Sequence, residues 1–454
     1  MWEAKREFAG LPVECCIPMP RNGSCVIIGA GLAGLTAAYR LQSRGWKVLV
    51  LEALQRIGGR VFSYRFPQAP GLVCELGGEW IGADHKAVRE LCDELGLDLD
   101  RHQYSFSFWN GRTRTRTYRP GAWSFSRIAG RKFNAFAKRF ERFDEAQIRA
   151  LDQFDWWSIL RTFGFTPNEL LRRDLMDSTD FGESIRLTSA YTAAAEYIES
   201  NPTDEMDYKI RGGNSQLPYG LIGKLGPDSF RLQSKVRAVH QSGLGVGVFV
   251  EGRRSPFRAD YCICTVPAQC LSRIKWKPEL PREQAEAARQ LQYSRIMKTA
   301  VLFNRRFWTA PKRCGFSTFT TRISDFCFDS TYGQTGTPGI LCSYSIGDKA
   351  DDLASETSKA NIKKWIREDM LSVAGVEPRE AGDIQAIDVR PQAWQRVPWI
   401  GGAYAFYRPG QWFTVRPLLQ RPHGRVLFAG EHLAELQGFM EGAVNTGQEA
   451  ADRL

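Results

Sequence analysis

The sequence predicts an α/β fold that begins with a Rossmann-like βαβ unit, and three observations near the amino terminus support this prediction. Residues 24–28 form a short apolar run that is typical of a buried parallel strand. Residues 33–44 place leucine and alanine at helical spacing, and residues 46–52 form a second apolar run. Because the chain has 454 residues, we expect two or three folding units rather than one.

Further helices and strands are expected along the rest of the chain. Apolar residues at helical spacing predict helices at 85–96, over most of 127–195, at 280–293, at 352–374 and from about 438 to the end. Apolar or alternating runs predict strands at 229–240, 246–251, 261–266, 298–303 and 425–430. The segment RTRTRTYR at 112–119 alternates with period two, so we expect a strand with its arginines on one face.

The net charge of +11 is concentrated in one window of the sequence. Residues 101–142 contain eleven lysine and arginine side chains and a single acidic residue, Glu141. A solvent-exposed basic face explains this window, and a docking surface for an anionic partner is the alternative. Nucleic acid stays open as that partner, although no recognition motif accompanies the charge.

Cysteine and histidine usage argues against a metal site. The chain has 11 cysteines and five histidines, with no CxxC pair. No stretch has the length and apolar character of a membrane span, and the first 23 residues lack the apolar core of a secretory signal. We therefore expect no metal, no transmembrane segment, unpaired cysteines and a cytoplasmic location, with residues 1–23 as an N-terminal extension.

The first motif with chemical content is a glycine fingerprint between the first strand and the first helix. Gly29 allows a tight turn, Gly31 lets the backbone approach a pyrophosphate, and Gly34 lets the helix pack closely on the strand. Glu52 ends the second strand, where its carboxylate can accept hydrogen bonds from ribose hydroxyls. Strand, helix, second strand and terminal acid together predict dinucleotide binding.

Two further glycine-rich segments favour FAD over NAD. The sequence RIGGR at 56–60 places a glycine doublet between arginines, which suits a loop folding back over a pyrophosphate. The sequence ELGGEW at 75–80 follows soon after. Its glycines would let the backbone approach a flat ring system, and we include Gly77, Gly78, Glu79 and Trp80 among the cofactor contacts.

These blocks and several later ones resemble the flavin amine oxidase superfamily, which includes monoamine oxidases, polyamine oxidases and L-amino-acid oxidases. The resemblance runs from about residue 24 to 454. It rests on VIIGAGLAGLTAAYRL, Glu52, RIGGR, ELGGEWIG, RGGNSQLP, TVP at 265–267 and FAGEH…GFMEGAVNTGQEAA. It implies a Rossmann-like FAD-binding domain assembled from the discontinuous segments 24–110, 211–275 and 400–454. The segments 111–210 and 276–399 would form an α+β substrate-binding domain.

The resemblance also implies cofactor contacts outside the fingerprint. Gly430 and Glu431, just past the last strand of the FAD domain, would meet the ribityl and pyrophosphate region. Val236 matches the strand that contacts adenine, and Arg60 matches an arginine near the pyrophosphate. Met440 belongs to the carboxy-terminal block and is included with them.

Three residues are expected to act on the substrate side. Lys298 stands ten residues before Trp308, as does the family's lysine, which holds a water at flavin N5. Tyr404 and Phe439 match the two walls of the aromatic cage of the monoamine oxidases. Ala403 stands where those enzymes carry the cysteine that bonds to flavin, so we expect non-covalent FAD.

The resemblance therefore predicts a flavin enzyme that oxidises an amine. A hydride equivalent would pass from the α-carbon to N5, the imine would hydrolyse, and O2 would reoxidise the flavin to give H2O2. Amino-acid oxidases usually place a carboxylate-binding arginine just after the second glycine segment, and this sequence has Trp80 and Ile81 there. Alternatives are an L-amino-acid oxidase with a relocated arginine (Arg408, or one from 101–142), a non-amine flavin desaturase or oxidase, and an FAD-bearing interaction protein. The electron acceptor and a homodimer stay open.

Overall fold

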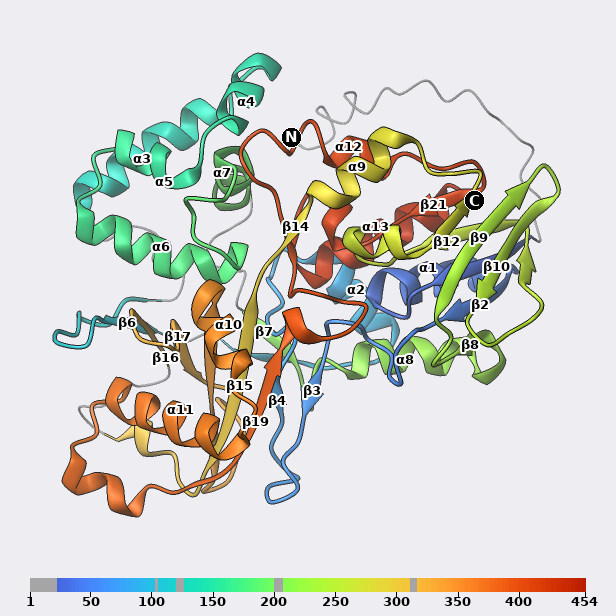
Figure 1. The fold of residues 1–454 in the computed structure, drawn as a ribbon. Helices are drawn as coiled ribbons and strands as arrows, with labels where there is room; N and C mark the ends of the chain where they lie inside the picture. The colour runs from blue at the N-terminus through green and yellow to red at the C-terminus, as the bar shows by residue number, and fades with distance from the viewer. Residues whose placement is uncertain (1–22, 103–104, 120–125, 200–206, 311–316) are drawn as a thin grey trace.

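A five-stranded parallel sheet organises one half of the molecule (Figure 1). The computed structural model describes residues 23–102, 105–119, 126–199, 207–310 and 317–454. The sheet has the order β21 (Val426–Phe428), β12 (Tyr261–Cys264), β1 (Ser24–Ile28), β2 (Lys47–Leu51) and β8 (Phe230–Arg231). Because its strands come from the beginning, the middle and the end of the chain, the Rossmann-like sheet is assembled from distant segments, as the sequence predicted.

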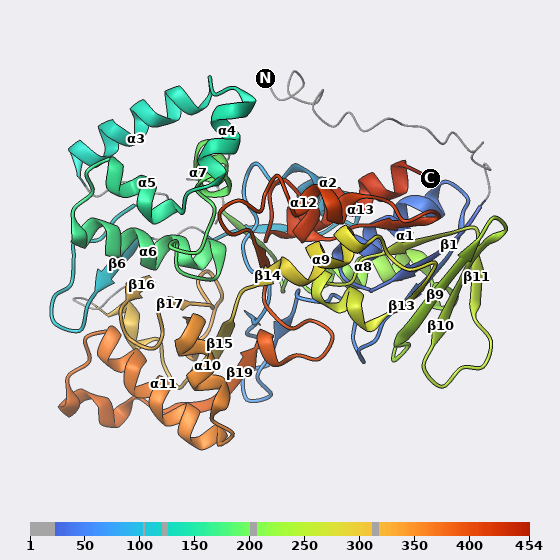
Figure 2. The same cartoon turned by 45° about the horizontal axis from the view of Figure 1, so that its top comes forward.

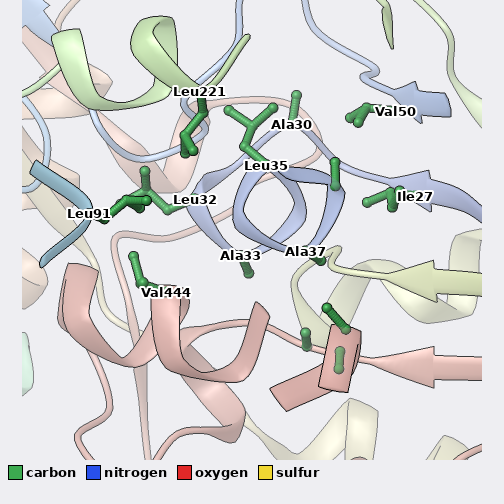
Figure 3. Close-up of a cluster of buried hydrophobic side chains, with 14 of the residues drawn as sticks. Ile27, Ala30, Leu32, Ala33, Leu35, Ala37, Val50, Leu91, Leu221 and Val444 are labelled. Atoms are coloured by element: carbon green, nitrogen blue, oxygen red, sulfur yellow. The ribbon is translucent and has the colours of Figure 1, made fainter. Parts of the chain in front are cut away.

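Helix α1 (Leu32–Ser43) follows β1 and is the most enclosed helix of this half. Figure 3 shows its side chains facing Leu91, Leu221 and Val444. These residues belong to α2 (Lys86–Glu94), α8 (Gln216–Leu225) and α13 (Met440–Asp452). Close packing requires Gly34, because a Cβ there would lie 2.0 Å from the carbonyl oxygen of Gly29. The start of α1 is thereby fixed at the carboxyl edge of the sheet.

Smaller sheets and helices complete this half. The four-stranded sheet has the order β11 (Phe257–Ala259), β10 (Gly245–Val250), β9 (Val236–Ser242) and β13 (Lys275–Lys277). Three strand pairs are β3 (Ser63–Tyr64) with β4 (Cys74–Glu75), β5 (Leu99–Arg101) with β7 (Tyr208–Ile210), and β14 (Gln292–Tyr293) with β20 (Ala405–Phe406). Two further helices are α9 (Arg282–Gln290) and α12 (Arg416–Gln420).

The other half contains a six-stranded, largely antiparallel sheet. Its order is β19 (Ala386–Ala393), β15 (Ile296–Phe303), β18 (Gly339–Ile346), β17 (Phe326–Asp329), β16 (Ser317–Thr320) and β6 (Phe106–Trp109). Helices α10 (Gly347–Ser355) and α11 (Lys359–Val373) pack on it. The exact division of the chain into domains stays a proposal, since β6 lies within the first expected FAD segment but pairs in this sheet.

Five helices form a separate group beside the six-stranded sheet. They are α3 (Arg127–Phe140), α4 (Glu145–Asp152), α5 (Trp156–Thr162), α6 (Pro167–Phe181) and α7 (Ala190–Glu199). Figures 1 and 2 both show this group at the opposite side of the molecule from β9 and β10. The helical prediction for 127–195 is therefore confirmed, and together the two halves give the mixed α/β architecture that was expected.

The strand predicted for RTRTRTYR is wrong. Residues 112–119 form a loop that makes only isolated bridges, and β6 occupies the edge of the sheet instead. The physical reason is that arginine alternates here with threonine, so a strand would have no apolar face to bury, whereas FSFW at 106–109 does. Arg114 instead donates hydrogen bonds to the hydroxyls of Ser107 and Thr318, each at 3.0 Å.

The eleven basic residues of the 101–142 window are all exposed. They lie at the end of β5, on the loop after β6, and on or just after α3, and none of them lines the cavity described below. The docking of an anionic partner to this face stays a prediction.

In the part of the chain that the structure describes, all eight cysteines are unpaired and buried, and no helix is both long and apolar enough to span a membrane. Residues 1–22 of the expected extension fall outside that part.

Helix α6 contains a buried ion pair that we expect to stabilise the helical group. Arg173 and Asp177 are fully buried, and the indole of Trp156 donates to Asp177 Oδ2 at 3.0 Å. Asp177→Ala should lower the free energy of unfolding by about 3–5 kcal/mol, because Arg173 would keep a buried charge without this partner. Chemical denaturation measures the loss. Glu145→Ala breaks the exposed pair with Arg149 at the same helical spacing, and should cost less than about 1 kcal/mol. Equal losses in both variants would contradict this account.

Candidate active site

One cavity brings together almost all of the residues predicted from the sequence. It is lined at one end by the carboxyl edge of the parallel sheet and at the other by β15 and β18 of the six-stranded sheet. The predicted residues that line it are Gly29, Gly31, Glu52, Arg60, Gly77, Gly78, Glu79, Trp80, Val236, Lys298, Tyr404, Gly430, Glu431, Phe439 and Met440. Gly34 alone does not line it, which agrees with its expected packing role.

The amino terminus of α1 is open to this cavity. Gly31 is the N-cap residue and supplies no side chain to the first backbone N–H groups. A Cβ at position 31 would meet no other atom within 4 Å, so the space in front of the helix is empty of protein. Gly29 has φ of +108°, and a Cβ there would lie 2.6 Å from Thr265 Oγ1. Open N–H groups at the positive end of a helix suit a pyrophosphate.

Glu52 lies at the same edge of the sheet, beside Val236. Its Oε2 accepts from the backbone N–H of Ala30 at 2.7 Å and its Oε1 from that of Leu54 at 2.8 Å. Burial raises the pKa of this carboxyl, and the two backbone bonds oppose the shift. Each carboxylate oxygen can accept a second hydrogen bond, so the group can still bind ribose hydroxyls. This donor and acceptor set fits the adenosine half of a dinucleotide.

Arg60 and Glu431 join three distant parts of the chain at the middle of the cavity. The Arg60 guanidinium forms an ion pair with Glu431 and also donates to the carbonyl oxygen of Ala403 at 3.1 Å. Glu431 Oε2 accepts from the backbone N–H of Gly438 at 3.0 Å. The RIGGR loop, the FAGEH block and the loop before Phe439 are therefore held in one arrangement.

Lys298 and Glu79 form a buried ion pair at the end of the cavity that β15 and β18 line, which we call the far end. Lys298 Nζ donates to Glu79 Oε2 at 2.7 Å and to the carbonyl oxygen of Gly77 at 2.9 Å, and Lys209 also pairs with Glu79. Although burial raises the pKa of Glu79, the two ammonium groups outweigh it and hold that pKa below its ordinary value. An ammonium group has three N–H donors, so Lys298 keeps one for a water or substrate in the cavity.

Tyr404 and Phe439 lie on neighbouring loops at this end. A Cβ at Gly438 would lie 3.4 Å from the Tyr404 ring, and both aromatic side chains line the cavity. The hydroxyls of Tyr404 and Tyr344 are 2.9 Å apart, and both contact the carbonyl oxygen of Thr179. Burial raises the pKa of Tyr404 well above its ordinary value, so the phenol stays neutral. The Tyr404 wall is consequently fixed in orientation.

Several cavity residues were not predicted from the sequence. Thr179 and Asp180, from the end of α6, and Tyr344, from β18, line the substrate end. No motif marks them, because a helix end in one domain meets the cavity only through the tertiary fold. Among the described residues, the only arginines that line the cavity are Arg60 and Arg273, and Arg408 is exposed elsewhere.

Comparisons with known proteins agree with this geometry. The model of a family described as flavin containing amine oxidoreductase matches residues 32–454. An L-amino-acid oxidase from Siganus canaliculatus is 30% identical over 461 residues, covering 94% of this chain and 84% of that protein. An L-amino acid dehydrogenase from Synechocystis sp. is 26% identical, covering 97% of this chain and 96% of that protein.

Solved structures of amine oxidases share the fold. Putrescine oxidase bound to putrescine superposes with a TM-score of 0.81 at 22% identity, covering 95% of this chain and 98% of that one. Cyclohexylamine oxidase from Brevibacterium oxydans superposes with a TM-score of 0.80 at 23% identity and the same coverage. At these identities the likeness concerns the fold, and the substrate has to be argued from the cavity.

Proposed function

We propose that this chain, which belongs to the flavin-containing amine oxidoreductase family, uses non-covalently bound FAD to oxidise an amine that lacks a carboxylate. The composition of the far end of the cavity is the observation that supports a substrate without a carboxylate. Tyr404 and Phe439 supply apolar walls, and Asp180 supplies an acidic group. Among the described residues, the arginines that line the cavity are Arg60, which is already paired with Glu431, and Arg273. A carboxylate substrate would meet a like charge at Asp180.

FAD fits the cavity by the chemistry of its lining. The amino terminus of α1 and Gly31 would hold the pyrophosphate, Glu52 and Val236 the adenosine, and Arg60 with Glu431 the centre of the cofactor. When bound, the flavin supplies the hydride acceptor, N5, and passes the electrons to an acceptor that we propose to be O2, with H2O2 as product.

The protein's own contribution is to position the amine and to exclude water. The walls formed by Tyr404 and Phe439 suit an uncharged amine nitrogen and the carbon next to it. Lys298, through its remaining N–H donor, would hold a water close to the reacting atoms. The amine must arrive deprotonated, so the mechanism requires no dedicated protein base. Release of the imine and its hydrolysis would give a carbonyl compound and ammonia or a smaller amine.

An L-amino-acid oxidase or dehydrogenase is the second candidate, because the curated relatives carry those activities in their names. The test is anaerobic mixing of the protein with a panel of primary amines and L-amino acids while flavin absorbance is followed. We expect amines to bleach the flavin rapidly. Bleaching by L-amino acids alone would select the second candidate. A flavin that no compound bleaches would favour an FAD-bearing interaction protein.

Non-covalent binding of the cofactor is a separate expectation. Residue 403 is alanine, and its methyl group lines the cavity without a nucleophile. Acid precipitation should therefore leave all of the FAD in the supernatant, identified by its absorbance and mass. Flavin that stays with the precipitated protein would contradict this part of the proposal.

The cytoplasmic location is likewise proposed, and cell fractionation would test it.

A further inference from the structure

The Asp180 side chain lies where the far end of the cavity meets the helical group. It stands on the last turn of α6, which ends before Gly182 in the left-handed conformation with φ of +71°. The preceding residue, Thr179, provides the carbonyl oxygen that the Tyr404 hydroxyl contacts. Asp180 therefore lies next to the hydroxyl end of the Tyr404 wall, and it lines the same cavity as Lys298 and Phe439.

One oxygen of the Asp180 carboxyl is fixed and the other has room for a ligand. Oδ2 accepts a hydrogen bond from the Tyr197 hydroxyl at 2.7 Å. Oδ1 has only a 3.4 Å contact with the hydroxyl of Thr179. Since the side chain is only partly buried and faces the cavity, Oδ1 can accept a short hydrogen bond from a bound molecule.

Asp180 forms no ion pair with a described residue. Arg173 is paired with the neighbouring Asp177, and its charge also lowers the pKa of Asp180 through space. The other titratable side chains around Asp180 are Tyr197 and Glu196 of α7, Tyr344 of β18 and Tyr404, and none of these is a cation. A carboxylate in a largely apolar cavity is stabilised most by a cation that the ligand brings with it.

We propose that Asp180 binds a second, distal ammonium group of the substrate, so that the preferred substrates are amines with two cationic nitrogens. The inference rests on the proposed function, and it names the substrate class of that site. The reacting nitrogen arrives uncharged between Tyr404 and Phe439, while the distal nitrogen stays protonated and donates to Asp180 Oδ1. A monoamine of equal length offers no ammonium group to Asp180. Its binding removes water from the carboxylate without replacing that water by an ionic partner.

The test compares kcat/KM for a diamine and for the monoamine of equal chain length, with 1,4-diaminobutane and 1-aminobutane as the first pair. L-lysine and L-norleucine form a second pair, which separates free diamines from amino acids with a cationic side chain. We expect the wild type to prefer the dicationic member. Asp180→Asn should lower that preference at least about thirtyfold, because it removes one partner of a buried charge pair.

Two further variants show whether the effect belongs to the charge at the cavity. Asp180→Glu keeps the charge one methylene further along and should keep a diamine preference with a shifted optimum of chain length. Asp174→Asn removes a carboxylate from the same helix that does not line the cavity, and its effect on the ratio should be small. Parallel losses for diamine and monoamine in Asp180→Asn would overturn the inference and leave the amine oxidase proposal standing. A flavin that no amine bleaches would instead overturn the proposed function.

The pH dependence of the same ratio gives an independent measurement. Burial raises the pKa of Asp180 to about 6, against the hydrogen bond from Tyr197 and the charge of Arg173. The carboxylate is therefore charged at neutral pH and becomes protonated as the pH falls through about 6. The preference for the diamine should fall over that interval in the wild type and should be flat in Asp180→Asn. Deprotonation of the reacting amine affects both substrates of a pair and largely cancels in the ratio. A wild-type ratio that does not change with pH would contradict the role of Asp180.

Discussion

Replacing Gly31 with leucine is expected to yield a folded protein that purifies without FAD. Residue 31 has φ of −78°, which any residue adopts, and an added Cβ meets no protein atom within 4 Å. The backbone at residue 31 therefore accepts a side chain without strain, and the first carbon of that side chain meets no protein atom. The new side chain instead occupies the space in front of α1 that we assign to the pyrophosphate. We expect the Kd for FAD to rise at least about a hundredfold, which corresponds to about 2.7 kcal/mol of lost binding free energy.

Visible flavin absorbance and a titration with FAD measure this effect, and circular dichroism confirms the fold. Gly223→Leu is the matched control. Gly223 lies in helix α8, it is exposed, and a Cβ added there meets nothing within 4 Å. This control should keep a full complement of FAD. If Gly31→Leu also retained stoichiometric flavin, the cofactor would have to lie elsewhere.

The parts of the fold that the sequence predicts are those with a local signature. The βαβ unit can be predicted because Gly29, Gly31 and Glu52 must occur at fixed places along a strand, a turn and a helix. The helix predicted at 352–374 is divided instead into α10 and α11, because residues 356–358 leave the helical conformation. Helix boundaries of this kind depend on tertiary packing and on capping, and the spacing of apolar residues gives no information about either.

The residues that we propose for the cofactor lie in sequence motifs, and much of the proposed substrate half of the cavity does not. Arg60 and Glu431 lie in blocks with recognisable sequence, and their ion pair in the structure follows from that placement. Asp180 and Tyr344 come from segments that a sequence pattern describes only as a helix and a strand. Their meeting at Thr179 depends on how the helical group docks on the six-stranded sheet, which is a property of tertiary packing. The substrate had therefore to be argued from the cavity.

Lys298→Met gives the largest expected loss of turnover among variants that keep the cofactor. Methionine fills a similar volume, and Glu79 keeps Lys209 as its ionic partner, so the buried carboxylate is not left without a counter-charge. What disappears is the N–H donor that faces the cavity beside Tyr344 and Trp80. We expect kcat/KM for the best amine to fall on the order of a hundredfold to a thousandfold, as for other residues that position a proton or a water.

The Lys209→Met variant distinguishes the loss of this N–H donor from a general weakening of the ion pairs to Glu79. Lys209 binds the same carboxylate, Glu79, but does not line the cavity, so its loss weakens the charge network without removing a group from the reacting atoms. We expect a loss of less than about tenfold, since Lys298 still neutralises Glu79. Stopped-flow rates of flavin reduction and of reoxidation by O2 would show which half-reaction needs Lys298. Equal losses in the two variants would mean that the network orders the cavity and that Lys298 contributes nothing beyond its charge.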